Sequence, residues 1–454
     1  MVRKADDSLV FRLLSYCGAV LLLWSAFYNR YPLVFPDSGY YIFTPKNPDR
    51  SAGYYFFIQL TSMRLSLWLV IVAQALITSF LLMRVSCVFL KNNKFKEIIA
   101  FVILVLLVVV TDISKYVCWL MPDILTSWIF LGFSLFFLSL KWYDKLFAIS
   151  VICLSLSCHN SHILIAVVSI LLLSVIGFIY RSKKPSIWDV SKKLGTCIFI
   201  ILLAVCALGF LVWGKFSIFP PQKGKFIIAK FTNYSLLFKT LNTYCPTKEW
   251  KMCEYKKEIQ SIEGQSPGAI LWHKESPFVK HNLFKDEKEL EEVMFCALKS
   301  NISQVIKYSF RDTFKLLARV NSSEDLSQYD GWMIGPMKRN FPKEFKYFRH
   351  SNQSKKLPIR VKILFLDEQY LQICIWVYFL IAMFIFILFK EDQLALVMIF
   401  VLLFLFLNAL ITASISGVFG RYNMRVAWLM PYMLLLTSFV FIGKRCSEKD
   451  RNVV

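Results

Sequence analysis

Acidic residues are scarce in this sequence: 30 Asp and Glu stand against 53 Lys and Arg, which gives a formal net charge of +23. Such a balance can indicate a nucleic-acid-binding protein, but the sequence lacks any nucleic-acid recognition motif. The basic residues lie mainly in loops and in one hydrophilic stretch. We therefore exclude nucleic acid as a partner. Membrane lipids with anionic headgroups or phosphate-bearing substrates are the expected partners.

A clean signal-peptide cleavage site is also missing. A short basic start (Arg3, Lys4 and Arg12) precedes an apolar run to about Tyr28, which resembles a secretory signal peptide. Because no small-residue cleavage site follows, we predict that the run is retained as the first membrane-spanning helix.

Hydrophobic residues are abundant instead. They make up 57% of the 454 residues and include 42 Phe, whereas a soluble domain has about 45–50%. They form uninterrupted blocks of roughly 17–25 residues, the length that crosses a hydrocarbon core of about 30 Å. The sequence therefore predicts an all-α polytopic membrane protein.

About ten blocks qualify as membrane-spanning helices. They lie near 11–29, 66–89, 97–114, 119–140, 146–157, 162–180, 196–213, 370–389, 393–412 and 426–442. An even count places both termini on one side. Short basic loops fall on that side, at 91–96, 141–145, 181–193, 390 and 444–445. The positive-inside rule makes it the cytoplasm, and we expect a multi-pass protein of the plasma (inner) membrane.

The unusual polar segments fall on the opposite, extracytoplasmic side. They are 30–64, 115–121, 158–162, 215–368 and 416–425. The helix near 146–157 is short for a full span. We therefore predict that 146–180 is a helix pair whose polar tip is recessed into protein.

Residues 215–368 differ in character from the rest. Pro220 and Pro221 end the seventh helix, and charged residues, Trp and Tyr increase after them. We predict a mainly helical extracytoplasmic domain that separates an N-terminal membrane module (1–214) from a C-terminal one (369–454). Cys245 and Cys253 would form a disulfide if this region is extracytoplasmic.

Asp37 is the candidate catalytic residue. It follows Pro36 in the first external loop and precedes Gly39, so that a turn presents its carboxylate beside the membrane surface. Partial desolvation there can tune a carboxylate as a general base. The alternative is a solvated loop acid that caps the turn.

An apolar stretch too short to span follows Asp49 and Arg50 and is interrupted at Gln59 and Arg64. It predicts an interfacial amphipathic helix that gives the first external loop a structure of its own. Tyr40, Asp49 and Arg50 are candidate substrate-binding residues in this loop.

Asp112, Lys115 and Asp123 lie where the third predicted helix ends and the fourth opens. An acid at a helix opening is often only an N-terminal cap. Together with Asp37, these acids could instead bind an acceptor hydroxyl or a metal. A divalent metal on Asp37 and Asp123 stays an open alternative.

Cys158, His159 and His162 interrupt what would otherwise be one long hydrophobic stretch. Ionisable groups at membrane depth usually mark a function. We favour hydrogen bonding of the two His to a phosphate or sugar. A zinc site and a purely structural turn between helices are the alternatives.

Arg421, Tyr422 and Arg425 precede the last span on the outer face. A guanidinium presents a planar fork of donors that suits phosphate. Interfacial anchoring by Arg and Tyr is the alternative interpretation.

Taken in order and placement, these motifs resemble those of the C-type (GT-C) superfamily of integral membrane glycosyltransferases. The resemblance covers mainly 1–213 and 370–442, and the insertion resembles that of bacterial membrane proteins of unassigned function. The residues that carry it are Asp37, Gln74, Asp123, His159 to His162, Arg421, Tyr422 and Pro431. It implies a polyprenyl-phosphate-linked sugar as donor and an envelope glycan, lipid or protein as acceptor.

The resemblance suggests an inverting transferase in which Asp37 deprotonates the acceptor hydroxyl. Arg421, Arg425 and His162 would stabilise the leaving phosphate, and the 215–368 domain would bind the acceptor. A transporter or flippase of an anionic lipid or lipid-linked sugar is the first alternative, although the sequence shows no internal repeat. A non-enzymatic subunit of an envelope assembly machine is the second.

The predicted topology can be tested by thiol labelling. A Cys introduced near Asn93 should be cytoplasmic and one near Gln265 extracytoplasmic, because basic loops alternate with polar ones along the chain. An impermeant thiol reagent applied to intact cells should label only the second. Labelling of both from the same side would refute the ten-helix count.

Overall fold

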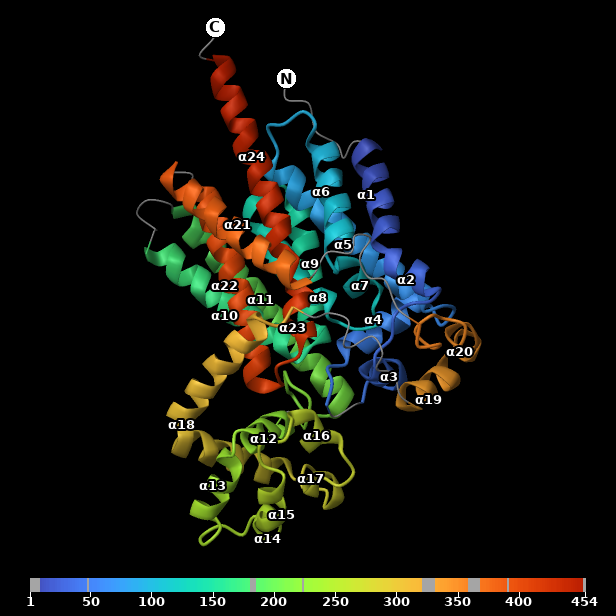
Figure 1. The fold of residues 1–454 in the computed structure, drawn as a ribbon, viewed down its shortest axis with the longest axis vertical. Helices are drawn as coiled ribbons and strands as arrows, with labels where there is room; N and C mark the ends of the chain where they lie inside the picture. Colours follow the sequence, from blue (N-terminus) through green and yellow to red (C-terminus); the bar gives the residue numbers. More distant parts are fainter. Residues whose placement is uncertain are drawn as a thin grey trace.

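The computed structural model describes residues 9–46, 49–179, 185–222, 224–320, 331–357, 368–389 and 392–451. Over these ranges the secondary structure is helical (Figure 1), and the extended pairing present there is one isolated bridge between Leu33 and Trp119. The predicted all-α class is therefore confirmed for the part of the chain that the structure describes.

Thirteen of the helices form the bundle. They are α1 (Leu9–Leu22), α2 (Trp24–Asn29), α5 (Trp68–Phe89), α6 (Lys96–Val110), α7 (Ile113–Cys118), α8 (Ile124–Leu138), α9 (Trp142–Cys158), α10 (Asn160–Ile179), α11 (Pro185–Trp213), α21 (Glu368–Leu388), α22 (Asp392–Ile415), α23 (Gly420–Ala427) and α24 (Leu429–Arg451).

The remaining helices lie outside the bundle. The first external loop contains α3 (Pro36–Phe43) and α4 (Gly53–Ser62). The large insertion contains α12 (Gly224–Asn233), α13 (Leu236–Tyr244), α14 (Lys251–Glu254), α15 (Lys256–Ser261), α16 (Pro267–Trp272), α17 (Pro277–Lys280), α18 (Glu287–Leu317), α19 (Gly331–Asn340) and α20 (Pro342–Phe348).

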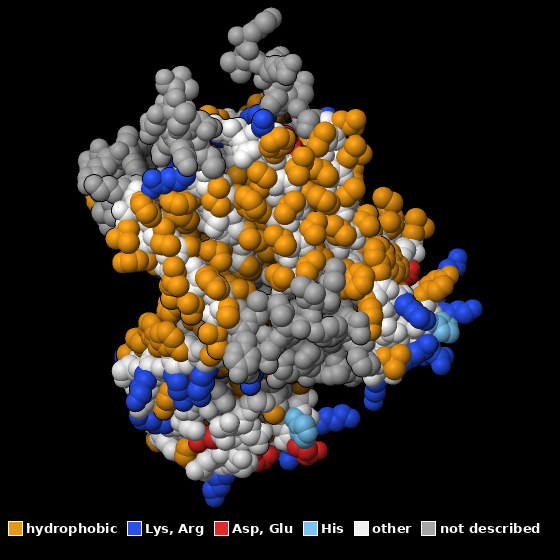
Figure 2. All heavy atoms as spheres, turned by 45° about the horizontal axis from the view of Figure 1, so that its top comes forward, with side chains coloured by type: hydrophobic (Ala, Val, Ile, Leu, Met, Phe, Trp, Pro, Cys, Tyr) orange, Lys and Arg blue, Asp and Glu red, His pale blue; other side chains and the backbone are white. Residues whose placement is uncertain are grey.

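Five helical stretches among the described residues are long and apolar enough to cross a membrane. They are Leu9–Asn29, Trp68–Phe89, Lys192–Trp213, Leu394–Ile415 and Gly420–Arg445. Hydrophobic side chains cover the middle of the face shown in Figure 2, between ends that carry Lys and Arg. The protein is therefore embedded in a membrane. The other predicted spans are shorter helices here, so the count of ten stays a prediction.

Several predicted helices have different limits in the structure. The stretch near 11–29 is divided at Leu23 into α1 and α2. The helix predicted over 119–140 begins only at Ile124, after Pro122, because proline cannot donate to the preceding turn. By contrast, α9 has 17 residues and is longer than predicted.

The first and last helices share one end of the bundle. Figure 1 shows the start of α1 and the end of α24 at the top, whereas α12 to α17 lie at the bottom. This arrangement agrees with termini on the side opposite the insertion. Which side is cytoplasmic stays a prediction.

Non-helical backbone within the bundle is satisfied by protein partners. The Leu33 N–H donates to the Cys118 carbonyl at 2.9 Å, and the Leu120 N–H donates to the Leu33 carbonyl at 2.9 Å. Away from water an unpaired peptide group would cost several kcal/mol. This pairing therefore holds the chain just before α3 against the segment between α7 and α8.

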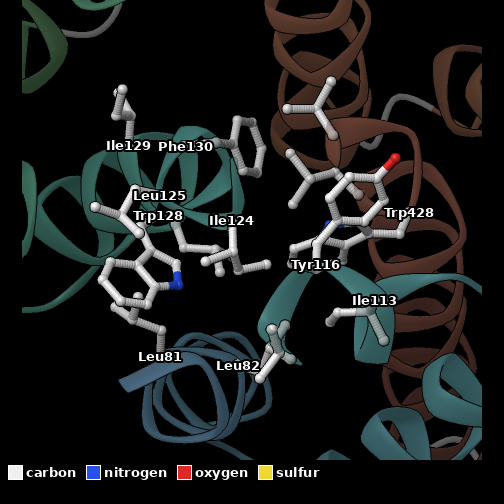
Figure 3. Close-up of a cluster of buried hydrophobic side chains, with 14 of the residues drawn as sticks. Leu81, Leu82, Ile113, Tyr116, Ile124, Leu125, Trp128, Ile129, Phe130 and Trp428 are labelled. Carbon is white, nitrogen blue, oxygen red and sulfur yellow. The ribbon is translucent and has the colours of Figure 1, made fainter. Parts of the chain in front are cut away.

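A cluster of buried hydrophobic side chains lies inside the bundle (Figure 3). It combines side chains from α5, α7, α8 and the junction of α23 with α24, and the labelled members are Leu81, Leu82, Ile113, Tyr116, Ile124, Leu125, Trp128, Ile129, Phe130 and Trp428. The indole N–H of Trp128 donates to Thr78 Oγ1 at 2.9 Å, which satisfies the one polar atom of this side chain. The cluster gives the segments above it a rigid base.

The described helices within the predicted domain 215–368 divide between two hydrophobic cores. Helices α12 to α18 surround a hydrophobic core of their own, which includes Ile228, Phe278 and Leu290. In α19 and α20, by contrast, Met337 and Phe348 belong to the core of the membrane bundle. The predicted domain therefore contains one independent core and one segment that belongs to the first external loop.

The second part of the insertion is bonded to the first external loop. The Tyr31 hydroxyl donates to Glu344 at 2.7 Å, and Asn340 donates to the Ile42 carbonyl at 2.6 Å. Gln353 pairs with both backbone groups of Val34, at 3.1 and 2.7 Å. These bonds hold the segment before α3 and the last turn of α3 itself.

Cys245 and Cys253 are joined by a disulfide, with Cα atoms 5.6 Å apart. The bond closes the short segment between α13 and α14 in the part of the insertion that has its own core. It lies where the sequence analysis expects one. Disulfides persist in oxidising compartments, so this bond favours an extracytoplasmic insertion.

Gly53 offers a test of how the first loop meets the α9–α10 tip. A Cβ at Gly53 would lie 2.3 Å from the Ser157 carbonyl oxygen, whereas a Cβ at Gly268 would have open space. We expect Gly53→Ala to lower the unfolding free energy by about 1–3 kcal/mol, because backbone atoms must move. Gly268→Ala is the control and should leave thermal unfolding in detergent unchanged. Equal melting temperatures for the two variants would refute the close approach.

Candidate functional site

Asp37 lies between two arginines at the end of the bundle that carries the insertion. Its Oδ1 accepts from Arg50 Nη2 at 2.9 Å, and its Oδ2 accepts from Arg421 Nη2 at 3.4 Å. Arg50 precedes α4 and Arg421 begins α23, so three distant segments meet at one carboxylate. The three side chains are 17%, 15% and 10% exposed, and a small part of each remains accessible.

The arginines determine the ionisation of Asp37. Burial alone would raise the pKa of this carboxyl, but the charges of Arg50 and Arg421 and their hydrogen bonds outweigh burial and lower the pKa below its ordinary value of 3.8. Asp37 is therefore ionised at neutral pH. While both arginines remain bound it is a weak base, contrary to the tuning by desolvation that the sequence analysis considered.

Aromatic rings hold the two guanidinium groups in place. Arg421 lies over the ring of Phe35 at 4.2 Å and over that of Tyr422 at 4.9 Å. Arg50 lies near the rings of Tyr40 and Phe226, at 5.7 and 5.6 Å. A stacked guanidinium keeps donors free at its edge, which suits it to recognise a phosphate or carboxylate.

Asp123 and Arg425 form a second ion pair, 3.3 Å apart, behind the first. Arg425 is fully buried and donates to Asn408 of α22 at 2.9 Å and to Ser161 of α10 at 3.4 Å. Asp123 occupies the N-cap position of α8, but its carboxylate makes no capping hydrogen bond to that helix. This pair joins four helices, and we assign Arg425 a positioning role instead of the predicted substrate contact.

The α9–α10 tip contributes one accessible histidine. His162 is buried, and its Nδ1 and Nε2 lie 2.8 Å from the Ser155 carbonyl and 2.7 Å from the Thr126 hydroxyl. Both nitrogens are thus used within the fold, which removes His162 from the predicted phosphate contacts. His159 is partly buried and receives the Ser161 hydroxyl on Nδ1 at 2.8 Å.

Asp112 and Lys115 lie deeper than predicted. They are 2% and 0% exposed, and the Lys115 ammonium lies 4.7 Å from the centroid of the Trp119 ring. The hydroxyl of the neighbouring Tyr116 donates to the Arg421 carbonyl at 3.4 Å. Asp112 and Lys115 are therefore buried and do not belong to the partly exposed part of the site.

The insertion reaches the site through α12 and α16. Lys225 binds Asp49 at 2.6 Å, and both side chains are more than nine-tenths buried. Asp49, predicted to bind substrate, thus joins the first loop to the insertion. The Trp272 ring lies 6.3 Å from that of Tyr40 and remains 43% exposed, so these two rings form an open aromatic surface beside Arg50.

Sequence reasoning missed several residues of this region. Tyr41 lies within electrostatic reach of Asp37 and Asp123, and its ring packs against Tyr54 at 5.1 Å. Gln74, singled out only by the resemblance, accepts from Tyr54 at 2.7 Å and donates to the Val117 carbonyl at 2.7 Å. Two successive tyrosines after a Pro-Asp turn were the available signal for Tyr41. No sequence signal pointed to Lys225 or Asn408.

The alternative metal sites are not assembled. Over the described ranges, no group of three or more His, Cys, Asp or Glu side chains lies close enough to hold a metal ion. Asp37 and Asp123 each face guanidinium groups, and Cys158 lies beside a His162 whose nitrogens are both engaged. The described residues therefore form neither a metal site on Asp37 and Asp123 nor a zinc site at the α9–α10 tip.

The chain matches no protein-family model, no curated protein and no solved structure.

The site is suited to an anion. Three guanidinium groups (Arg50, Arg421, Arg425) surround two carboxylates (Asp37, Asp123), which leaves one positive charge in excess. The partly exposed members are Arg50 and Arg421. A ligand phosphate could replace Asp37 as their partner, which would leave the Asp37 carboxylate without these counter-charges.

The ionisation of Asp37 predicts an effect of pH on stability. Because its pKa is lowered in the folded protein, Asp37 stabilises the fold above about pH 4, and this contribution is lost as the pH falls through the lowered pKa. The difference in melting temperature between the parent and Asp37→Asn should thus be constant from about pH 7 to about pH 5 and shrink below about pH 4. Asp189→Asn, at an exposed ion pair, is the control and should differ little from the parent. A gap that widens toward acid pH would contradict the assignment.

Proposed function

We propose that the protein is an inverting membrane glycosyltransferase that transfers a sugar from a polyprenyl-phosphate donor to an envelope acceptor. The observation that carries this proposal is the carboxylate of Asp37 held between Arg50 and Arg421 at the external end of a membrane bundle. A carboxylate and a phosphate-binding fork, side by side and partly shielded from water, are the two groups that such a transfer requires.

Donor binding would activate Asp37. The lipid phosphate competes for Arg50 and Arg421, and each guanidinium that turns to the phosphate removes a charge that lowers the pKa of Asp37. Burial then acts on the carboxyl with less opposition and raises its pKa. Asp37 becomes a stronger base only when donor is present. In the empty site it therefore does not take up a proton.

The acceptor O–H proton passes to the Asp37 carboxylate, and the acceptor oxygen attacks the anomeric carbon from the face opposite the phosphate. The new glycosidic bond forms while the bond from the anomeric carbon to the phosphate oxygen breaks, and that oxygen retains the electron pair. Arg421 and Arg50 stabilise the resulting charge, with the greatest effect in a low-dielectric site.

The acceptor would approach from the insertion. Tyr40 and Trp272 present their rings beside Arg50, and the Trp272 side chain is 43% exposed. Flat aromatic faces suit the apolar faces of sugar rings. His159, at the α9–α10 tip, lies within electrostatic reach of Arg50, Arg421 and Arg425 and could donate to a sugar hydroxyl.

A transporter or flippase of an anionic lipid is the second candidate. The same pair of arginines would bind its phosphate, and Asp37 would serve only as their partner in the empty state. The two functions differ in whether Asp37 must accept a proton. A substitution that removes the negative charge of Asp37 but keeps the shape of its side chain therefore distinguishes the two functions.

Asp37→Asn keeps the shape of the side chain but loses its basicity. We expect it to lower sugar transfer by at least about 10²-fold, or roughly 2.7 kcal/mol in the barrier, while donor binding persists. Arg421→Lys should impair transfer less than Arg421→Ala, because Lys keeps the charge but loses the planar fork. The assay is consumption of a panel of polyprenyl-phosphate hexoses and pentoses by membranes, together with the sugar content of the envelope polymer in cells.

Asp189→Asn makes the same chemical change at an exposed position and should retain parental activity. Donor binding can be followed separately with a labelled lipid phosphate. An Asp37→Asn protein that inserts correctly and transfers sugar as fast as the parent would exclude this mechanism. Lipid movement without sugar transfer in the parent would favour the transporter.

A further inference from the structure

Helix α18 carries an exposed apolar row along its C-terminal half. Ile302, Ile306, Phe310 and Phe314 recur every fourth residue and therefore share one side of the helix. They are 45–61% exposed. Large apolar side chains in such a continuous row usually mark a surface that contacts lipid or another protein.

A basic row runs beside the apolar one. Lys307, Arg311 and Lys315 follow one another at spacings of four residues, Lys299 lies just before the kink at Asn301, and Arg319 lies two residues after the end of α18. Between residues 293 and 319 the one acidic residue is Asp312, which is buried and paired with Lys230 at 2.9 Å. The exposed surface of this half of α18 is thus apolar and cationic, with no exposed carboxylate.

The apolar row continues the surface of the membrane bundle. The rings of Phe310 and Phe314 both lie 6.3 Å from that of Phe406 in the candidate span α22. Phe406 lies nine residues before the last residue of α22, Ile415, which corresponds to about 13 Å along the helix. Figure 1 shows this half of α18 rising from the insertion toward α23, and in Figure 2 hydrophobic side chains at the lower left border basic ones.

We propose that the C-terminal half of α18 is an interfacial membrane helix whose basic row binds the anionic headgroups of the external leaflet. The apolar row enters the acyl region, and the long basic side chains beside it extend toward the lipid phosphates. This combination of an apolar face with flanking lysines is what binds a helix into an anionic lipid surface. The surface is separate from the Asp37 cluster and does not depend on the proposed reaction.

The depth of α18 can be measured with a fluorescent label on full-length protein in nanodiscs. The exposed thiols are removed by Cys17→Ser and Cys374→Ser, and bimane is attached at Ile306→Cys or, as a control, at exposed Lys257→Cys in α15. Nitroxide lipids should quench the label at 306 and spare the label at 257, whereas aqueous iodide should do the reverse. Both positions are exposed, so neither substitution disturbs a core.

The choice of lipid tests the basic row. At equal mole fractions, nitroxide phosphatidylglycerol should accumulate near residue 306 at least about fivefold over nitroxide phosphatidylcholine. The triple change Lys299→Gln, Lys307→Gln and Lys315→Gln should abolish this preference. The matched control removes the same charge at exposed sites distant from the bundle, by Lys239→Gln, Lys257→Gln and Lys274→Gln, and should retain it.

Three results would overturn the proposal. Iodide quenching at residue 306 equal to that at residue 257 would place the row in water, and protection from both quenchers would mean that protein covers it. Equal quenching by the two lipids in the parent would refute the headgroup preference.

Discussion

The attachment of one carboxylate to two guanidinium groups is the interaction on which the external end of this protein depends. Asp37, Arg50 and Arg421 come from separate segments, and none could be buried alone without a penalty of several kcal/mol. Their mutual neutralisation allows the first loop to fold onto the bundle. Because the three charges do not cancel completely, the same cluster retains affinity for an anion.

The first external loop is a structural element in its own right. It is bonded to the segment before α8, to α20 and the residues after it, and through Asp49 to α12. Non-helical backbone is tolerated beside a membrane only when protein supplies its hydrogen bonds. The many partners of this loop meet that requirement and simultaneously fix the position of Asp37.

The sequence predicts the helices better than it predicts their partners. Long apolar blocks indicate membrane helices because the bilayer demands them, and Asp37, Arg421 and Asp123 stand out as charges at the ends of such blocks. Which charges pair is a property of packing between distant segments. Asp123 and Arg425 lie 302 positions apart, and no local sequence pattern indicates their contact. His162 misled for a related reason, since a histidine engaged by Ser155 and Thr126 has the same sequence signature as an available one.

The distance along the chain between Asp37 and Arg421 also imposes an order on biogenesis. Their hydrogen bond joins residues 384 positions apart, and at about 5–20 residues per second a ribosome needs about 20–80 s to add that length. Until Arg421 has been synthesised, Arg50 is the one guanidinium partner available to Asp37. A polypeptide that terminates before α23 therefore contains Asp37 and Arg50 but not the complete cluster, and maturation of the site awaits insertion of the last helix.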